Sequence, residues 1–220
     1  MKQKPLILLN SSPDREHLRE KFLQSYNEWQ FKNDYELKVV IEQNSIHLLR
    51  QRDVTADGFK RPVIIVDDDM LLTNETDFRK SVDFCQNTKV GIVTNGWKLS
   101  ANTKREVKDE FVKRKLVFTG GGMVLSIEAQ KVIANMPKIR YWSDNVAWSI
   151  ECTKAGLQNW YYRGSMAIHK VCQNGGRKAL LAKTESVHHE DVVVRRGISG
   201  KMLIQSEKDV IWNEDKIEKK

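Results

Sequence analysis

Short apolar runs alternate with longer amphipathic stretches along most of the chain. The apolar runs fall at residues 6–9, 37–41, 63–66, 90–93 and 116–118, and most of them contain β-branched residues. Because β-branched residues favour β-strands, we expect a strand at each run, and we expect a final strand at residues 160–168. Strands that alternate with helices along a chain are typical of a layered α/β domain.

The stretch after the first run predicts an amphipathic helix. Leu18, Phe22, Tyr26 and Trp29 recur at spacings of four, four and three, which places them on one face of a helix. Pro13, with polar residues on both sides, suits the first turn of that helix.

Four further helices are expected at residues 77–86, 103–115, 127–135 and 144–155. Val107 and Phe111 are four residues apart, so both would face inward from the second of them. Gly156 stands where a left-handed residue would end the last helix. From about residue 184 the chain becomes polar, and we expect irregular structure there.

Length and composition indicate one folded domain. The chain has 220 residues, of which 40% are hydrophobic and 30% charged, and these proportions exclude a disordered or fibrous protein. A chain of this length hides roughly 70 to 75% of its unfolded surface on folding, which allows one sizeable core. We expect residues 1–184 to form this core, and residues 185–220 to form a polar extension that packs on it or trails from it.

Targeting signals and disulfides are not evident. No apolar run approaches the roughly 20 residues that span a bilayer, and the first run is too short for a signal peptide. Cys85, Cys152 and Cys172 have no C-x-x-C spacing, which argues against a disulfide framework and a zinc knuckle. We therefore expect a cytoplasmic protein without a membrane span.

The charge balance is basic and uneven. Lys and Arg number 37 against 29 Asp and Glu, a net charge of +8, and residues 163–184 hold five basic residues and no acidic one. Such a charge keeps proteins apart in solution, and it also suits an anionic partner. Composition does not choose among nucleic acid, lipid headgroups and a nucleotide-linked substrate.

The most informative stretch is V-I-I-V-D-D-D-M, in which an apolar strand runs directly into Asp67, Asp68 and Asp69. Adjacent carboxylates repel one another, and a divalent cation such as Mg²⁺ or Mn²⁺ compensates that repulsion. Ligands of open α/β sheets also bind at the carboxyl ends of strands. The alternative interpretation is a solvated turn or a helix start.

Three classes of protein share an apolar strand that ends in aspartates. Haloacid-dehalogenase phosphatases use D-x-D-x-T, but Leu71 occupies the last position here. Response-regulator receivers need a separate phosphoacceptor aspartate and a later lysine at a strand end, for which no position stands out. Nucleotide-sugar glycosyltransferases place a D-x-D motif at the end of a mid-chain strand.

Further motifs make the chain resemble family 2 glycosyltransferases of the GT-A fold over roughly residues 6–176. The sequence N-S-S-P-D-R after the first strand looks like the family's nucleotide-contacting loop. V-V-I-E-Q-N-S is similar to the strand whose acidic end contacts the base, with Glu42 where aspartate is usual. T-G-G-G-M-V-L-S resembles the glycine-rich strand that lines the sugar pocket.

Two later motifs extend the resemblance. The segment W-S-D-N-V-A-W-S-I-E-C-T-K-A-G is similar to the family's catalytic helix, with Asp144 at the position of the catalytic aspartate. Ser143 and Glu151 depart from it, because glutamate and arginine are usual there. The strand that ends in A-I-H-K places His169 where the family has a histidine that reaches the metal.

The resemblance implies a single GT-A (Rossmann-like) domain with a mixed, mostly parallel sheet flanked by helices. It implies transfer of a sugar from a nucleotide sugar, with a UDP-sugar favoured, to an acceptor hydroxyl, with Mn²⁺ or Mg²⁺ as cofactor. Asp69 would ligate the metal directly, Asp67 would contact metal or ribose, His169 would reach the metal, and Asp144 would be the general base. The nucleotide-sugar contacts implied are Asn10, Ser11, Arg15, Glu42, Asp67, Asp68, Gly121 and Gly122.

Each of these roles has a structural alternative. Asp144 could cap the helix that follows it, and His169 could be a structural residue. A bend would explain the glycines, and a solvated strand end would explain Glu42. Inversion of the anomeric centre is implied only by the resemblance, since retaining GT-A enzymes share the donor-side pattern.

The acceptor is the least defined partner. A compact basic enzyme suits an anionic acceptor, and small bacteriophage glycosyltransferases that modify hydroxymethylated bases in DNA are one such class. The acceptor contacts expected are Trp97, Trp142, Asn145, Arg177 and Lys178. A cell-surface or lipid-linked glycan and a peptide are the alternative acceptors, and a non-enzymatic nucleic-acid-binding module is the alternative of another class.

Overall fold

The computed structural model describes residues 3–41, 46–98, 100–103, 105–114, 117, 121–136, 144–169, 186–189, 192–196, 202–206 and 211–212. Eight strands form one mixed sheet in the order β2–β1–β3–β7–β5–β8–β4, with β6 paired to β8. Their bounds are β1 (Leu6–Ser11), β2 (Glu36–Ile41), β3 (Val63–Asp67), β4 (Met70–Leu71), β5 (Val90–Lys98), β6 (Phe111–Arg114), β7 (Met123–Leu125) and β8 (Gln158–His169).

Most strands of this sheet share one direction. β1 pairs in parallel with β2 and β3, and β5 pairs in parallel with β8. β7 lies antiparallel between β3 and β5, so β1, β2, β3, β5 and β8 all point the same way. β4 and β6 run antiparallel to β8. The expected mixed, mostly parallel sheet is confirmed, and its parallel strands all end at the same edge.

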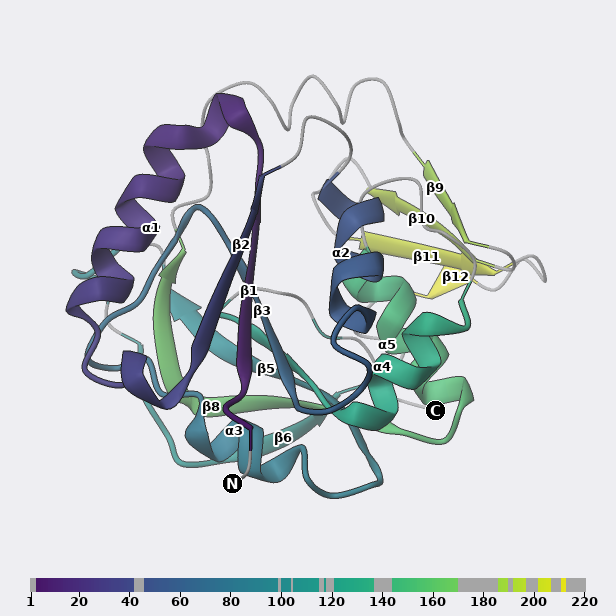
Figure 1. Ribbon diagram of the computed structural model, residues 1–220. Helices are drawn as coiled ribbons and strands as arrows, with labels where there is room; N and C mark the ends of the chain where they lie inside the picture. The colour runs from purple at the N-terminus through teal and green to yellow at the C-terminus, as the bar shows by residue number, and fades with distance from the viewer. Residues whose placement is uncertain are drawn as a thin grey trace.

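Helices cover both faces of the sheet, as Figure 1 shows. They are α1 (Glu16–Glu28), α2 (Ile46–Thr55), α3 (Arg79–Phe84), α4 (Ile127–Ala134) and α5 (Asp144–Lys154). Alternate residues of β1 face opposite layers, because successive side chains of a strand point to opposite sides. Leu6 and Leu8 join the core beneath α2, α4 and α5, whereas Ile7 and Leu9 join the core beneath α1 and α3.

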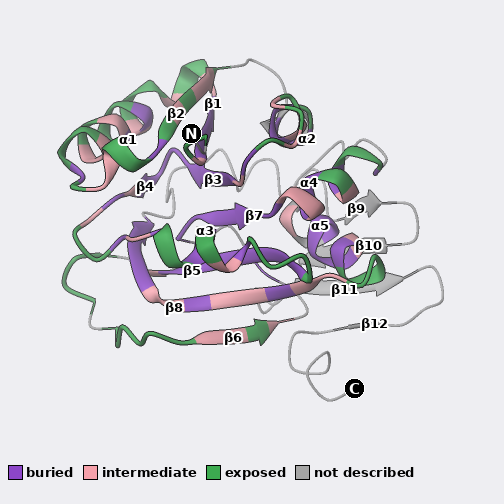
Figure 2. Ribbon diagram, turned by 60° about the horizontal axis from the view of Figure 1, so that its bottom comes forward, coloured by how far each residue is buried: buried purple, intermediate pink, exposed green. Residues whose placement is uncertain are grey.

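The centre of the sheet forms the floor of both cores. β3 and β7 are buried along their whole length, and the first seven residues of β5 are buried too (Figure 2). Half-buried and exposed residues appear toward the edges, in β2 on one side and in β6 and part of β8 on the other. No helix in the described part of the chain is long and apolar enough to span a membrane.

Most predicted elements are confirmed, including the helices at α1, α3, α4 and α5. Gly156 has φ of +81°, as its predicted place at the end of α5 requires. The helix predicted at residues 103–115 is wrong, because residues 111–114 form β6 and Val107 is 45% exposed. The strand predicted at residues 116–118 lies outside the described residues except for Val117.

Six elements were not predicted. Two of them, α2 and the short strand β4, belong with the eight-stranded sheet, and the other four are strands in the polar end of the chain. The irregular structure expected after residue 184 is wrong for β9 (Ser186–His189), β10 (Val192–Arg196), β11 (Met202–Ser206) and β12 (Ile211–Trp212). These four form an antiparallel sheet of their own in the order β12–β11–β10–β9.

Candidate functional site

Strand ends bring the three predicted metal ligands together. Asp67 is the last residue of β3, and His169 is the last residue of β8. β4 begins directly after Asp69 and pairs antiparallel with β8, with Met70 opposite His169. This register holds Asp69 beside the histidine, although the two residues are 100 positions apart in sequence.

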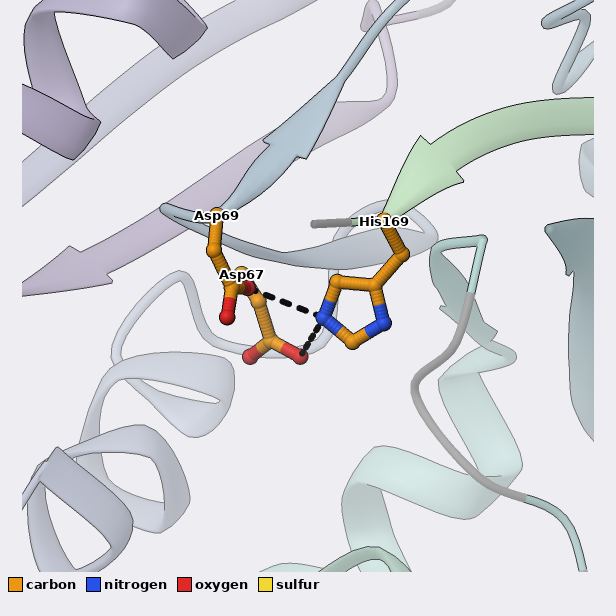
Figure 3. Close-up of side chains that lie close together, drawn as sticks. All are labelled: Asp67, Asp69 and His169. Carbon is orange, nitrogen blue, oxygen red and sulfur yellow. Dashed lines mark hydrogen bonds and ion pairs between the residues drawn. The ribbon is translucent and has the colours of Figure 1, made fainter. Parts of the chain in front are cut away.

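The side chains of Asp67, Asp69 and His169 converge on a small volume, as Figure 3 shows. Nε2 of His169 lies 2.9 Å from Oδ1 of Asp69 and 3.7 Å from Oδ2 of Asp67. One ligand atom from each of the three residues lies within 4.8 Å of the others, and all three residues are buried. The acidic cluster is therefore not a solvated turn.

The donor set fits a divalent ion. Oδ2 of Asp69 is buried and has no hydrogen-bond partner among the described residues. A buried carboxylate oxygen that accepts no hydrogen bond is costly, and a coordinated cation would satisfy it. Carboxylate oxygen and imidazole nitrogen are ligands that Mn²⁺ accepts. Asp67, Asp69 and His169 together can hold such an ion.

Two arginines supply positive charge to the aspartates. Arg15, in the turn before α1, places Nη2 2.5 Å from Oδ1 of Asp68 and 3.6 Å from Oδ2 of Asp69. Arg50, on α2, donates to Oδ1 of Asp67 in a buried ion pair. The cluster is thus held by a charge-assisted hydrogen bond from Arg50 on one side and by ion pairs with Arg15 on the other.

Asp68 is bound to the end of β1. The Ser11 hydroxyl donates to Oδ2 of Asp68 at 2.7 Å, while Arg15 contacts its other oxygen. Burial raises the pKa of the Asp68 carboxyl above its ordinary value, and Arg15 and Ser11 act against that rise. Ser11, Arg15 and Asp68, all predicted to contact the nucleotide sugar, therefore form one network beside the metal-ligand group.

Asn10 lies next to Asp67 across the β1–β3 ladder. Its Nδ2 donates to Oδ2 of Asp53 at 3.0 Å, which fixes the orientation of the amide. Its Oδ1 is buried and has no hydrogen-bond partner among the described residues. Asn10 therefore offers an acceptor atom close to the aspartate cluster.

The predicted sugar-pocket glycines have a packing role. A Cβ on Gly121 would lie 1.9 Å from the carbonyl oxygen of Gly96, because the Gly121 backbone donates to Asn95 of β5 at 3.2 Å. Gly122 has φ of +101°, and a Cβ there would lie 2.8 Å from the Phe78 ring. Both glycines are therefore needed for residues 121 and 122 to lie against β5 and the Phe78 ring, independently of any contact with a ligand.

The predicted acceptor contacts are only partly described. Trp97, near the end of β5, meets the His169 ring edge-on with ring centroids 5.6 Å apart. The Arg105 guanidinium lies 5.6 Å from the centre of the Trp97 ring. Asn145 is half-buried in the first turn of α5. Trp97 is thus the predicted acceptor residue that the structure places beside the metal-ligand group.

The structure says little about the remaining predicted site residues. Glu42, Trp142, Arg177 and Lys178 fall outside the described residues, and Asp144 is described only as the first residue of α5.

Arg50 is a site residue that the sequence reading missed. It lies on α2, the helix that the apolar pattern did not predict. The available signal was topological, because parallel strands such as β1, β2 and β3 need crossover connections, which are usually helical. A helix between residues 41 and 63 follows from that rule, whereas the pairing of Arg50 with Asp67 does not.

Among the comparisons with known proteins, the one with solved structures supports the fold. No family model matches the sequence. No curated protein matches it either. A mannosyltransferase from Pyrobaculum calidifontis, solved with GDP-Man and Mn²⁺, is similar with a TM-score of 0.57 and 13% identity, over 83% of this chain and 61% of that one.

Two further solved structures are similar. S. aureus TarS (residues 1–349) gives a TM-score of 0.53 at 11% identity, over 75% of this chain and 59% of that one. A Drosophila β-1,4-galactosyltransferase 7 variant with manganese, UDP-Gal and xylobiose gives 0.51 at 15% identity, over 81% of this chain and 79% of that one. The chain spans about three fifths of the first two proteins. With its sheet order and strand-end site, it has the GT-A fold of nucleotide-sugar glycosyltransferases.

Proposed function

We propose that the chain is a metal-dependent glycosyltransferase that moves a sugar from a nucleotide sugar to an acceptor hydroxyl. The observation that carries this proposal is the buried group of Asp67, Asp69 and His169 at the carboxyl edge of a GT-A sheet. Similar structures were solved with Mn²⁺ and GDP-Man or with manganese and UDP-Gal, which supports a nucleotide-sugar donor. We favour a UDP-sugar.

The donor side of the site is assigned to the network around the aspartates. Asp67, Asp69 and His169 would hold Mn²⁺ or Mg²⁺, which would stabilise negative charge on the departing diphosphate. Asn10 and Ser11 end β1 beside this group and would contact the nucleotide. Further donor contacts are assigned to Arg15, Glu42, Asp68, Gly121 and Gly122.

Asp144 is proposed as the general base. It would take the proton of the acceptor hydroxyl as that oxygen bonds to the anomeric carbon, while the nucleotide diphosphate leaves with the electrons of the broken bond. Its position at the start of α5 and the motif around it support the assignment. The same position suits a helix cap, and asparagine caps a helix as well as aspartate does but cannot act as a base. Asp144→Asn should therefore abolish transfer and leave nucleotide binding unchanged.

A binding measurement tests the proposed donor site. The melting temperature of the wild-type protein should rise when UDP and Mn²⁺ are added together, since a ligand of the native state stabilises it. Asp69→Asn removes one negative ligand and should lose that rise. Asp83→Asn is the matched control, because Asp83 is an exposed aspartate on α3 and should leave the rise unchanged. An Asp69→Asn protein with the full wild-type rise would contradict the assignment.

We further propose a hydroxymethylated base in DNA as the acceptor. The net charge of +8 and the Trp97 ring beside His169 support it, since base recognition uses basic surfaces and aromatic stacking. Duplex affinity should then fall steeply with salt, and sugar should pass to hydroxymethylated DNA in preference to glycan acceptors. Transfer to a lipid-linked or cell-surface glycan alone would select the alternative acceptor. DNA binding that is unchanged in Asp69→Asn, together with no turnover of any nucleotide sugar by the wild-type protein, would select a non-enzymatic module.

A further inference from the structure

A cavity of about 220 Å³ lies at the β8 side of the sheet, apart from the metal-ligand group. Among the described residues, its lining consists of Arg105, Glu106, Tyr161, Arg163 and Met166. The first two belong to an exposed segment that leads into β6, and the other three belong to β8 (Figure 2). Backbone hydrogen bonds join the segment to β8, from Lys108 to Arg163 at 3.1 Å and from Arg163 to Glu110 at 3.0 Å. Backbone pairing therefore holds the two walls of the cavity together.

Arg105 brings to this cavity a positive charge that is not compensated by a carboxylate. In the part of the chain that the structure describes, it forms no ion pair, and the neighbouring Glu106 pairs with Lys108 at 3.0 Å instead. A second guanidinium is that of Arg163, whose Nη1 lies 3.0 Å from Oε2 of Glu110 in an ion pair at the surface. A guanidinium carries five N–H donors in a fork that matches phosphate oxygens. Two of them in the lining of one cavity therefore suit a phosphate.

Arg105 also connects the cavity to the metal-ligand group. Its Nη1 donates to the carbonyl oxygen of Trp97, and its guanidinium lies 5.6 Å from the centre of the Trp97 ring. On its other side, the half-buried Trp97 ring meets His169 edge-on at 5.6 Å between ring centroids. The cavity, Arg105, Trp97 and His169 thus follow one another, so a ligand at the metal-ligand group can extend over Trp97 into the cavity.

We propose that the cavity binds a backbone phosphate of a nucleic-acid acceptor, held by Arg105 and Arg163, while a neighbouring base stacks on Trp97. The inference rests on the proposed function, because it concerns the acceptor of that reaction. Proteins bind single-stranded nucleic acid through positive charges that follow the backbone and aromatic rings on which bases stack. The volume is below the roughly 300 Å³ at which pockets for drug-sized ligands begin, which suits one phosphate with part of its sugar.

The lining favours nucleic acid over a lipid-linked acceptor. A lipid phosphate would use the same arginines, but its chain would also need an apolar path out of the cavity. Three of the five described lining residues are charged, namely Arg105, Glu106 and Arg163. The aromatic surface beside the cavity is a single indole ring, which matches one base.

Salt-dependent binding of an oligonucleotide tests the proposal. The probe is a labelled single strand with one 5-hydroxymethylcytosine, titrated by fluorescence anisotropy at several salt concentrations. Arg105→Gln and Arg163→Gln should each weaken binding at least about fivefold, because a charge-assisted contact is lost. Each should also reduce the slope of log affinity against log salt by about 0.7, the value for one phosphate contact on a single strand. Arg105→Lys keeps the charge and should keep the wild-type slope.

Two further variants separate this role from general effects. Trp97→Leu should weaken binding at least about fivefold with an unchanged slope, since base stacking releases no counterions. Arg79→Gln is the matched control, because Arg79 is also an exposed arginine beside an aromatic ring, 4.0 Å from the centre of Phe31. Phe31 precedes the start of β2, away from the carboxyl edge, so Arg79→Gln should match wild type although it removes the same charge.

The inference is overturned if wild type does not bind the oligonucleotide, or if either folded variant, Arg105→Gln or Arg163→Gln, keeps the wild-type slope. Loss of transfer to a lipid-linked glycan in these variants, with oligonucleotide binding unchanged, would overturn it in favour of a lipid phosphate. The proposed function fails by a different result, namely no rise in the melting temperature of wild type with UDP and Mn²⁺. Both arginine variants should keep that rise, because neither arginine contacts the network around the aspartates among the described residues. The two failures are therefore distinguishable.

Discussion

At the scale of single residues, Gly121 shows how closely two backbones approach beside the site. The carbonyl oxygen of Gly96 occupies the space where a side chain on residue 121 would begin. The two segments are joined there by hydrogen bonds between Asn95 and residues 121 and 122. The glycine-rich motif is thus explained by the fold before any ligand is considered.

Gly121→Ala should destabilise the protein by about 2–3 kcal/mol, because the new methyl group overlaps backbone that cannot move aside cheaply. Gly156→Asn is the control, since a side chain there meets nothing within 4 Å and asparagine tolerates its positive φ. Urea unfolding of both variants measures the difference. Equal stability of Gly121→Ala and wild type would contradict the close approach.

Asp67, Asp69 and His169 could be predicted as neighbours from sequence, because two apolar strands each end in a ligand residue. Their charge partners could not. Arg15 was expected near the nucleotide, and Arg50 was not expected at all, since a pairing between a helix and a strand end leaves no mark on local sequence. The same limit applies to the hydrogen bond between Asn10 and Asp53.

At the scale of elements, α2 was missed because it buries polar residues. Arg50, Gln51 and Asp53 are all less than 9% exposed, so the helix carries no continuous apolar stripe. The Gln51 amide donates to two carbonyl groups at the end of α4, each at 3.0 Å. Periodicity detects helices that bury apolar faces, whereas α2 buries Val54 together with polar residues that form hydrogen bonds and ion pairs.

β6 was mistaken for a helix because apolar residues in and before it have helical spacing. Val107 and Phe111 are four residues apart, but Phe111 lies in a strand and packs on residues that are distant in the sequence. Its ring stacks on Phe84 at 4.1 Å and on Tyr162 of β8 at 4.4 Å between ring centroids. Contacts of this range are set by the sheet and cannot be read from neighbouring residues.

A strand and a helix at residues 107–114 predict different effects of mutation on stability. Phe111→Ala should cost about 2 kcal/mol of unfolding free energy, since it removes a half-buried ring and two stacking contacts. Val107→Ala should change stability by less than about 0.5 kcal/mol, because Val107 is exposed. Comparable losses in the two variants, measured by urea unfolding, would favour the helix.

At the scale of the whole molecule, the sequence predicted the layered sheet because its central strands are continuous apolar runs buried on both faces. It also predicted the functional edge, because the parallel strands end there in polar residues. The four-stranded sheet formed by β9 to β12 was not expected, since these strands lie in a polar part of the chain and, in the part of the chain that the structure describes, pair with one another alone.

The central claim is that Asp67, Asp69 and His169 hold a divalent ion together with a nucleotide diphosphate. Anomalous diffraction at the manganese edge tests it most directly, in crystals of the whole chain grown with Mn²⁺ and UDP. We expect one strong peak about 2.1–2.3 Å from an oxygen of Asp69 and from Nε2 of His169, with the UDP phosphates beside it. UDP bound at this edge with no peak at these residues, or a peak elsewhere, would contradict the account.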